Sequence, residues 1–449
     1  MFESWKKQTY SCGTLNYTMK GVIVLFCWLL WGDFCLTLFE RVRPTIVPLI
    51  LKMHDASNLT IGLLCGTIPA LLNFIVNPII STASDRTRSR WGRRIPYLLF
   101  AVPFVSLFLI LLGFSDSIGT GLARLISGPD ASPGKYIIAV VSFFSVGFCF
   151  FDLFAGSVYY YLFSDVVPQP LMGRFMGFFR VAGNAGGLVF SLLAMPYVLT
   201  HMTLICVIAA LIYFVGFGGM CLHVREGEYP PPPPDGDGLG KKIAGYFKEC
   251  FSIPFFLIFF LGFALNYAST VCRSLFGMLQ SLEIVHLTTA QVGFFGALTG
   301  ILGMCLSIPV GFLIDKFHPI RIYIAGGWLI VITNIFAFFF CYTYYTALLF
   351  AILFCIVYVL QNSAALPLVI SIFPKEKFGQ FSSANALCKS LMLIACNSLG
   401  GWFIDLLGYQ YIFIWDLMFT FAVVLIFHWV YSRWKKLGGD TAYVPPMKA

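Results

Sequence analysis

Charge is what this sequence has least of. Asp, Glu, Lys and Arg together make up 11% of the 449 residues, whereas a soluble domain carries about 25%. Hydrophobic residues reach 59%, and the mean hydropathy is +0.85. A soluble fold has too little interior for so much apolar surface, and a disordered chain would have far less of it. We therefore expect lipid to surround much of this chain.

Metal-binding and catalytic motifs are also missing. The 14 Cys include no CxxC pair and no Cys/His cluster with zinc spacing, and Cys27, Cys65, Cys149 and Cys206 sit inside apolar runs as small packing residues would. The six His form no HExxH pattern, and no Walker-type phosphate loop is present. These absences disfavour a membrane hydrolase and an ATP-driven pump. We predict that the chain is not an enzyme and uses no cofactor and no metal.

The chain does contain a series of long apolar segments. A transmembrane helix needs about 20 apolar residues. Twelve segments satisfy this requirement, and they cover residues 20–50, 57–82, 95–114, 135–164, 174–198, 201–223, 253–281, 289–314, 321–341, 345–373, 379–405 and 409–432. The sequence therefore predicts an all-α integral membrane protein with twelve transmembrane helices.

A polar stretch rich in Pro and Gly, residues 225–250, divides these helices into two sets of six and is typical of a linker. The two halves echo one another, because an Asp-Lys or Asp-Arg pair follows both the second helix (Asp85) and the eighth (Asp315). Such repetition indicates a duplicated unit. We predict an N-terminal six-helix bundle in residues 1–224, a cytoplasmic linker in 225–250 and a pseudo-symmetric C-terminal bundle in 251–449.

The Lys and Arg residues predict the orientation of the chain. With the N-terminus placed inside, most of the 29 fall in inside segments. Those assigned to outside segments are Arg41, Arg43, Lys52, Arg124 and Lys135. We predict a multi-pass protein of the plasma membrane with both termini in the cytoplasm. The net charge of +9 then reports orientation and contact with anionic lipid, and it does not indicate a nucleic-acid partner.

Two loop motifs resemble a known family. The pattern Gly311-x-x-x-Asp315-Lys316 resembles the cytoplasmic loop signature of the major facilitator superfamily. The stretch from Asn77-Pro78 to Gly92-Arg93-Arg94, together with the segment that begins at Asp165, resembles the glycoside-pentoside-hexuronide:cation symporters, which include melibiose carriers, and the related sucrose-carrier group.

This resemblance implies the twelve-helix fold of that superfamily and a secondary transporter that alternates access to a site near the membrane midplane. It also implies a small solute of the sugar or glycoside class. A carrier or exporter of a non-sugar amphipathic solute is a second hypothesis, and a membrane sensor without transport is a third. We expect a monomer whose partners are the solute and the lipid bilayer.

The basic loops suggest gates on the cytoplasmic side. Asp85 could pair with Arg86, Arg93 or Arg94 and hold helix ends together in one conformation, and Asp315 with Lys316 occupy the matching place in the second half. The alternative interpretation is that these Arg residues only set the topology.

Three ionisable residues lie near the middle of apolar segments, where a charge costs roughly 2.5–3.5 kcal/mol. They are Asp33, Asp152 and Lys389. The resemblance implies that Asp33 contacts the sugar, that Asp152 fills an acidic role in helix 4, and that Lys389 is a functional Lys of helix 11. A structural ion pair is the alternative. Asp33 and Asp152 are also our candidates for coupling to a proton.

Three further residues are candidates for solute binding. Arg180 resembles an Arg of the sugar site in melibiose-type carriers, although it could instead reach toward the cytoplasmic surface. Arg273 in helix 7 is expected to line an outer cavity. Trp31, two residues from Asp33, could stack on a sugar face or point toward lipid.

Helix 2 departs from the family pattern. Asn73 and Asn77 are four residues apart, so they share one helix face. In cation-coupled melibiose carriers the resemblance places acidic sodium ligands at these positions. An amide oxygen brings no charge to a cation and cannot exchange a proton. We therefore favour a proton over sodium as a coupling cation, with uncoupled transport as the alternative.

Overall fold

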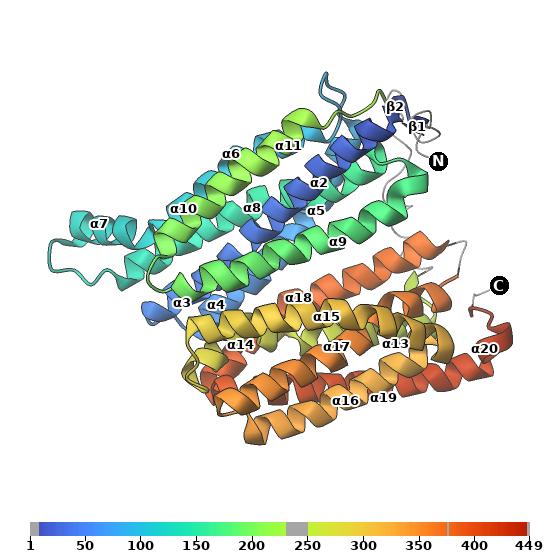
Figure 1. Ribbon diagram of the computed structural model, residues 1–449. Coiled ribbons are helices and arrows are strands. Elements are labelled where there is room, and N and C mark those ends of the chain that lie inside the picture. The colour runs from blue at the N-terminus through green and yellow to red at the C-terminus, as the bar shows by residue number, and fades with distance from the viewer. Residues whose placement is uncertain (1–8, 230–249, 375–376, 447–449) are drawn as a thin grey trace. The chain divides into compact units, whose positions relative to one another are not determined.

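The computed structural model describes residues 9–229, 250–374 and 377–446 (Figure 1). Within these residues it contains twelve helical segments long and apolar enough to cross a membrane, and each overlaps one of the predicted spans. Their bounds are Met19–Met53, Asn58–Arg86, Ile95–Gly113, Gly134–Val166, Gln169–Tyr197, Met202–His223, Pro254–Glu283, Thr289–Phe317, Pro319–Phe340, Tyr344–Ile372, Phe378–Leu407 and Tyr409–Lys436. Most of the predicted linker 225–250 lies outside the described residues; only 225–229 and 250 are described.

The chain forms two compact units. The first unit comprises Met1–Ser57 and Leu71–Pro234, and the second comprises Asn58–Ala70 and Asp235–Ala449. The second span is thus divided, because its beginning packs with the second unit. The domain boundaries expected from the sequence, 1–224 and 251–449, stay a prediction.

In the first unit a short antiparallel hairpin precedes the helices. Its elements are β1 (Thr9–Cys12), β2 (Leu15–Thr18), α2 (Met19–Glu40), α3 (Val42–Met53), α5 (Ile68–Arg86), α6 (Ile95–Gly113), α7 (Ser115–Ser127), α8 (Gly134–Val166), η2 (Gln169–Leu171), α9 (Met172–Val189), η3 (Phe190–Ala194), η4 (Met195–Tyr197), α10 (Met202–Ile212), η5 (Tyr213–Phe217) and α11 (Gly218–His223). Neither the hairpin nor α7 is predicted by the sequence analysis.

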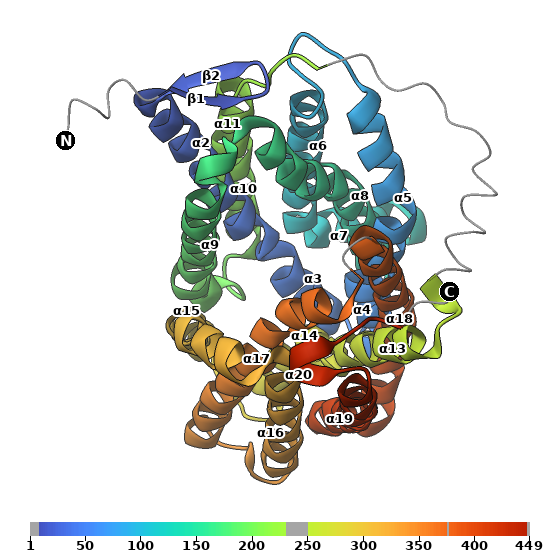
Figure 2. The same cartoon turned by 90° about the vertical axis from the view of Figure 1, so that its right-hand side faces the viewer.

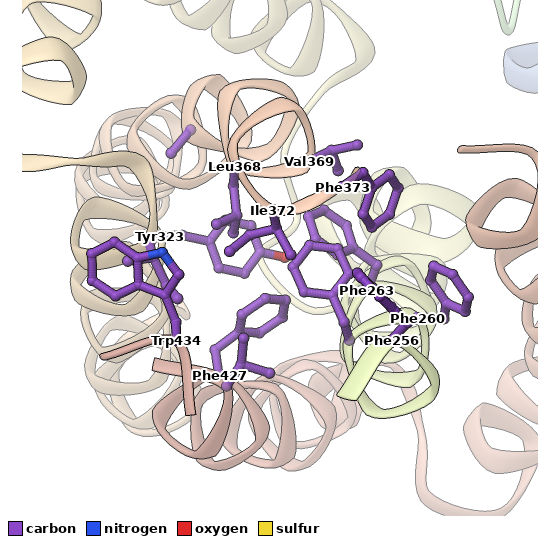
Figure 3. Packing of buried hydrophobic residues seen from close by; sticks show 14 of the residues in the cluster. Phe256, Phe260, Phe263, Tyr323, Leu368, Val369, Ile372, Phe373, Phe427 and Trp434 are labelled. Atoms are coloured by element: carbon purple, nitrogen blue, oxygen red, sulfur yellow. The ribbon is translucent and has the colours of Figure 1, made fainter. Parts of the chain in front are cut away.

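The second unit holds the start of the second span and the last six spans. Its elements are α4 (Asn58–Gly62), η1 (Leu63–Thr67), α13 (Pro254–Ser269), α14 (Val271–Glu283), α15 (Thr289–Phe317), α16 (Pro319–Phe340), α17 (Tyr344–Ile372), α18 (Phe378–Leu407), η7 (Tyr409–Tyr411), α19 (Ile412–Lys436) and α20 (Gly439–Ala442). Figure 3 shows its aromatic core, where Phe256, Phe263, Tyr323 and Phe427 from α13, α16 and α19 pack together.

Local signals explain where several helices begin and end. Thr18 precedes α2, and its hydroxyl accepts a hydrogen bond from the Gly21 backbone N–H. Thr288 and Thr343 cap α15 and α17 in the same way, each with a reciprocal side-chain bond. Helix α18 ends at Gly408, whose φ of 92° suits glycine.

The first span corrects one part of the predicted topology. Arg41 joins α2 to α3 with helical backbone angles, so the helix continues to Met53. Arg41 and Arg43 therefore lie inside the span and not in an outside segment. Arg43 is buried because it finds polar partners there, which a charge count along the sequence does not reveal.

Tight glycine contacts join the start of the second span to α18. A Cβ atom at Gly62 would lie 2.4 Å from the Asn397 carbonyl oxygen, and one at Gly401 would lie 2.4 Å from the Asn58 carbonyl oxygen. The Asp405 carboxylate accepts hydrogen bonds from the backbone N–H groups of Asn58 (2.8 Å) and Leu59 (2.9 Å). A side chain at either glycine would therefore displace this segment.

Candidate functional site

A buried carboxyl group lies where α2 meets α9 in the first unit; the two helices run side by side in Figure 1. Asp33 is 2% exposed, and its Oδ2 atom has no hydrogen-bond partner among the described residues. A Cβ atom at Gly183 of α9 would lie 2.9 Å from that oxygen. The glycine therefore allows α9 to approach the carboxyl group. A buried acceptor without a partner is uncommon in folded proteins, and a bound ligand, ion or water is one explanation for it.

Asp152 of α8 belongs to the same unit. It is half-buried, and its Oδ1 atom is enclosed without a hydrogen-bond partner in the described part of the chain. Arg43 lies within electrostatic range of Asp152. The Arg43 Nη1 atom donates to the Ser145 hydroxyl at 3.4 Å, and its guanidinium stands 5.9 Å from the centre of the Phe148 ring. Asp152 thus has a cation fixed nearby.

Sequence reasoning missed a third carboxyl group, that of Glu40. Glu40 follows Asp33 by seven residues on the same face of α2. Its Oε1 atom lies 4.0 Å from the Cβ position of Gly156 in α8, and its carboxyl group is within electrostatic range of both Asp33 and Asp152. The side chain is exposed although it lies far from both ends of the first span. The rule that selected Asp33 would have found Glu40 as well.

Arg180 and Trp31 are exposed side chains of the first unit, on α9 and α2 respectively. Arg180 is exposed on α9 and precedes Gly183 by three residues, so both share the face that meets α2. Trp31 is 48% exposed, and its ring stacks on Phe34 at 5.6 Å. The two helices that meet at Asp33 thus also carry an accessible guanidinium and an accessible indole; the Trp31 Nε1 atom lies 3.1 Å from the Cβ position of Gly216, so the indole points to another side of α2 than Asp33.

Asn73 and Asn77 share one face of α5, as their spacing predicts. The Asn77 Nδ2 atom donates to the Asn73 Oδ1 atom at 3.0 Å. The Asn77 Oδ1 atom is buried and has no partner among the described residues. Within the described ranges, no group of three or more His, Cys, Asp or Glu is placed to hold a metal ion.

Lys389 lies on α18 in the second unit. Its Nζ atom stands 3.5 Å from the centre of the Tyr267 ring, which is a close cation–π contact. One turn earlier on the same helix, the Asn385 Oδ1 atom is buried without a partner in the described part of the structure. Lys389 and Asn385 thus place two polar groups on one face of α18.

Arg273 occupies a hydrogen-bonded network within the second unit. It donates to Asp416 at 3.0 Å and to Asn334 at 2.7 Å, and its guanidinium lies 3.7 Å from the Phe354 ring centre. The Tyr358 hydroxyl also donates to Asp416, whose side chain is fully buried. This network ties α14, α16, α17 and α19 together. Sequence reasoning missed Asp416, although it stands alone in an apolar segment.

Charged side chains from the loop before α6 form ion pairs within the first unit. The Arg93 Nη2 atom donates to Asp165 at 2.6 Å, and the Arg94 Nε atom donates to the same carboxylate at 3.2 Å. Arg94 also pairs with Asp85. The hydrogen bonds to Asp165 raise the pKa of Arg93 above its usual value. The ends of α5, α6 and α8 are thereby joined by charge.

The remaining gate candidates differ from this arrangement. Arg86 is exposed in the last turn of α5. Asp315 and Lys316 were expected in a loop, but α15 continues to Phe317 and places both in its last turn. The helix ends at His318, whose φ of 66° turns the chain into α16. The Lys316 Nζ atom lies 5.3 Å from the Phe317 ring centre.

Glu226, just after α11, is a further residue that sequence reasoning missed. Its carboxylate accepts hydrogen bonds from three consecutive backbone N–H groups at the start of α6, those of Arg93 (3.0 Å), Arg94 (2.8 Å) and Ile95 (2.7 Å). The Tyr229 hydroxyl donates to the same carboxylate at 2.8 Å. Because Glu226 lies at the edge of the predicted linker, sequence distance concealed this contact.

Curated relatives match only parts of the chain. The "Membrane-associated transporter protein" of Mus musculus is 33% identical over 97 residues, which are 21% of this chain and 17% of that protein. The "Sucrose transport protein SUT1" of Oryza sativa subsp. japonica is 41% identical over 56 residues, 12% of this chain and 10% of that protein. The chain therefore matches less than a fifth of the length of these relatives.

Solved structures match along nearly the whole chain. A bacterial homolog to the human lysosomal transporter Spinster, in an inward-facing and occupied conformation, aligns with a TM-score of 0.67 at 16% identity over 92% of this chain and 96% of that chain. A D-xylose-proton symporter aligns with a TM-score of 0.63 at 14% identity, over 90% of this chain and 97% of that one. At these identities the likeness establishes the fold.

The family model described as "Major Facilitator Superfamily" matches residues 29–396 and 274–442. These ranges reach from the first span into the last. The family match, the twelve spans and the shared fold confirm the predicted fold class. The chain belongs to the Major Facilitator Superfamily and is a multi-pass membrane transporter of that type, not an enzyme.

Proposed function

We propose that the transported solute is a small polar molecule of the sugar or glycoside class. The observation that carries the proposal is the Asp33 carboxyl group, which is buried in the first span with an oxygen atom that no described residue satisfies. A carboxyl oxygen accepts hydrogen bonds from adjacent hydroxyl groups, which is the chemistry a sugar offers. Trp31 adds an exposed ring of the kind that packs on a sugar face.

Asp152, Arg180 and Lys389 complete the proposed binding residues. Asp152 also has an unsatisfied buried oxygen, Arg180 supplies an exposed guanidinium, and Lys389 supplies an ammonium group from the second unit. The partial likeness to sucrose transport proteins of Oryza sativa and Arabidopsis thaliana supports a sugar. Arg273 is a weaker candidate, because its donors are already engaged by Asp416 and Asn334.

We propose that sodium does not drive this transport. Asn73 and Asn77 bond to each other and contribute no negative charge. A sodium site built from neutral amides supplies ligand oxygens but none of the negative charge that strengthens the binding of a hard cation. Asp33 and Asp152 carry carboxyl groups that can exchange a proton, so the transport is either proton-coupled or uncoupled. Alternating access is the transport mechanism that membership of the superfamily favours.

Uptake by purified protein in proteoliposomes tests this proposal. Radiolabelled sucrose and a panel of glycosides are offered with and without an inward proton gradient, and with and without sodium. We expect uptake of at least one sugar, no rise with sodium, and loss of uptake in Asp33→Asn. Asp116→Asn serves as the control, because Asp116 is exposed on α7 and pairs with His54.

Each result has a separate meaning. Uptake of no sugar above that of empty liposomes would overturn the solute class while leaving the transporter fold intact. A clear sodium-dependent rise would overturn the argument from Asn73 and Asn77. Normal uptake by Asp33→Asn would remove Asp33 from the site.

A further inference from the structure

The start of α6 is a nest of backbone donors that a carboxylate fills. Gly92, with φ of 104°, turns the chain so that the next three N–H groups converge on Glu226. A Cβ atom at Gly92 would lie 2.5 Å from the Glu226 Cβ atom, so only glycine admits this approach. Helix N-termini favour an anion at this position. Here the anion comes from the segment that follows α11.

The same segment reaches the side chains of the ion-pair network. The Tyr229 hydroxyl donates to Glu226, and the Arg93 guanidinium stands 4.2 Å from the Tyr229 ring centre. The neighbouring Glu228 backbone N–H donates to the Thr14 hydroxyl of the hairpin at 2.8 Å. Figure 2 shows that hairpin beside the end of α11. Glu226 therefore holds the Arg93 backbone, and Tyr229 contacts the Arg93 side chain.

Arg93 and Arg94 are also the residues that pair with Asp165 and Asp85. Their guanidinium groups can reach these acids only if their backbone is fixed at the start of α6. Glu226 fixes that backbone through its three N–H contacts. Among the described residues, the Glu226 carboxylate forms no ion pair with the guanidinium group of Arg93 or Arg94. Any effect of Glu226 on the network therefore passes through the Arg93 and Arg94 backbone.

We propose that Glu226 is a positioning residue for the cytoplasmic ion-pair network: it holds the start of α6 so that Arg93 and Arg94 meet Asp165. The proposal rests on the superfamily's transport activity and not on the identity of the solute. Its consequence is that the beginning of the segment joining the two six-helix sets is coupled to the loop between the second and third spans.

Limited proteolysis of the purified full-length protein in nanodiscs tests this. Trypsin cleavage at Arg88 and Arg90, both exposed in the loop, is followed by mass spectrometry. Glu226→Gln should accelerate cleavage about tenfold, the loss expected for a charge-assisted hydrogen bond. Glu228→Gln is the matched control, because Glu228 is exposed and only its backbone is bonded; it should change the rate by less than about twofold.

A double-mutant cycle separates positioning from simple helix capping. If Glu226 acts through Arg93 and Arg94, the effects of Glu226→Gln and Asp165→Asn on the cleavage rate will be clearly non-additive. Acetate should also restore protection in Glu226→Ala, because a free carboxylate can enter the vacant nest, and should leave Glu228→Ala unchanged. Fully additive effects, or an unchanged rate in Glu226→Gln, would overturn the proposal.

Discussion

At the scale of single residues, the approach of α9 to Asp33 depends on one glycine. A methyl group at Gly183 would stand 2.9 Å from the Asp33 Oδ2 atom, which is the mobile end of its side chain. The fold can therefore tolerate alanine there, but the carboxyl group must move. We expect Gly183→Ala to lower solute uptake severalfold at unchanged expression.

Gly177 provides the control on the same helix, because a Cβ atom at that position meets nothing within 4 Å. Initial uptake rates in proteoliposomes check the comparison. Equal rates for Gly183→Ala and Gly177→Ala would contradict the placement of Asp33 in the site.

The Arg273–Asp416 pair leads to a prediction about stability. Asp416 is fully buried and accepts bonds from Arg273 and Tyr358. Asp416→Leu leaves the Arg273 charge without its partner, which should cost about 3–5 kcal/mol of unfolding free energy. The double variant Asp416→Leu with Arg273→Met removes both charges and should recover most of that loss. Thermal unfolding in detergent measures both, and a double variant no more stable than the single one would refute this assignment.

The residues found by sequence reasoning and those it missed differ in their surroundings. Asp33 and Lys389 stand alone in apolar runs, so their cost in lipid draws attention to them. Glu40 is followed directly by Arg41, and this pair resembles the polar end of a span. The predicted span 20–50 nevertheless includes Glu40, and the helical backbone at Arg41 agrees with that span. Partners distant in sequence, such as Asp416 for Arg273, depend on packing that no local pattern encodes.

At the scale of elements, the beginning of the second span depends on close packing against α18. A Cβ atom at Gly401 would lie 2.4 Å from the Asn58 carbonyl oxygen, which belongs to rigid backbone. We expect Gly401→Val to lower the free energy of unfolding by about 1–3 kcal/mol, the usual cost of overpacking.

Gly379→Val on the same helix is the control, since the residue exchange is the same and a Cβ atom there meets nothing within 4 Å. Thermal unfolding compares the two variants. If Gly379→Val is as destabilising as Gly401→Val, the contact with Asn58 is not the cause.

Long helices could be predicted from the sequence because twenty apolar residues in a row leave few other structures. Shorter elements could not. The hairpin Thr9–Cys12 and Leu15–Thr18 has strands of four residues, too short for a clear alternating pattern. Helix α7 has three buried residues, Ser115, Gly119 and Ala123. They are small or polar, and they form a buried face only because α8 packs against the helix. Their formation depends on neighbours that only the fold supplies.

At the scale of the whole molecule, the charge distribution predicts which side of the membrane each end occupies. The N-terminus, the C-terminus and the Arg-rich loop before α6 are expected inside, and α7 outside. Epitope tags at both termini should bind antibody only after the cell membrane is permeabilised, whereas a tag inserted at residue 130 should bind on intact cells. A terminal tag accessible on intact cells would reverse the orientation.

The divided second span has a consequence for fragments of this protein. A fragment ending at residue 229 would carry Asn58–Ala70 but not Asp405, Asn397 or Gly401, which that segment contacts. In such a fragment the side of Asn58–Ala70 that carries Gly62 would have no α18 to pack against. A fragment starting at residue 250 would have α18 but would lack the segment that covers it. When the two are produced together, this shared stretch should act as the recognition element for their reassembly, so that Gly401→Val in one fragment weakens complementation by the other.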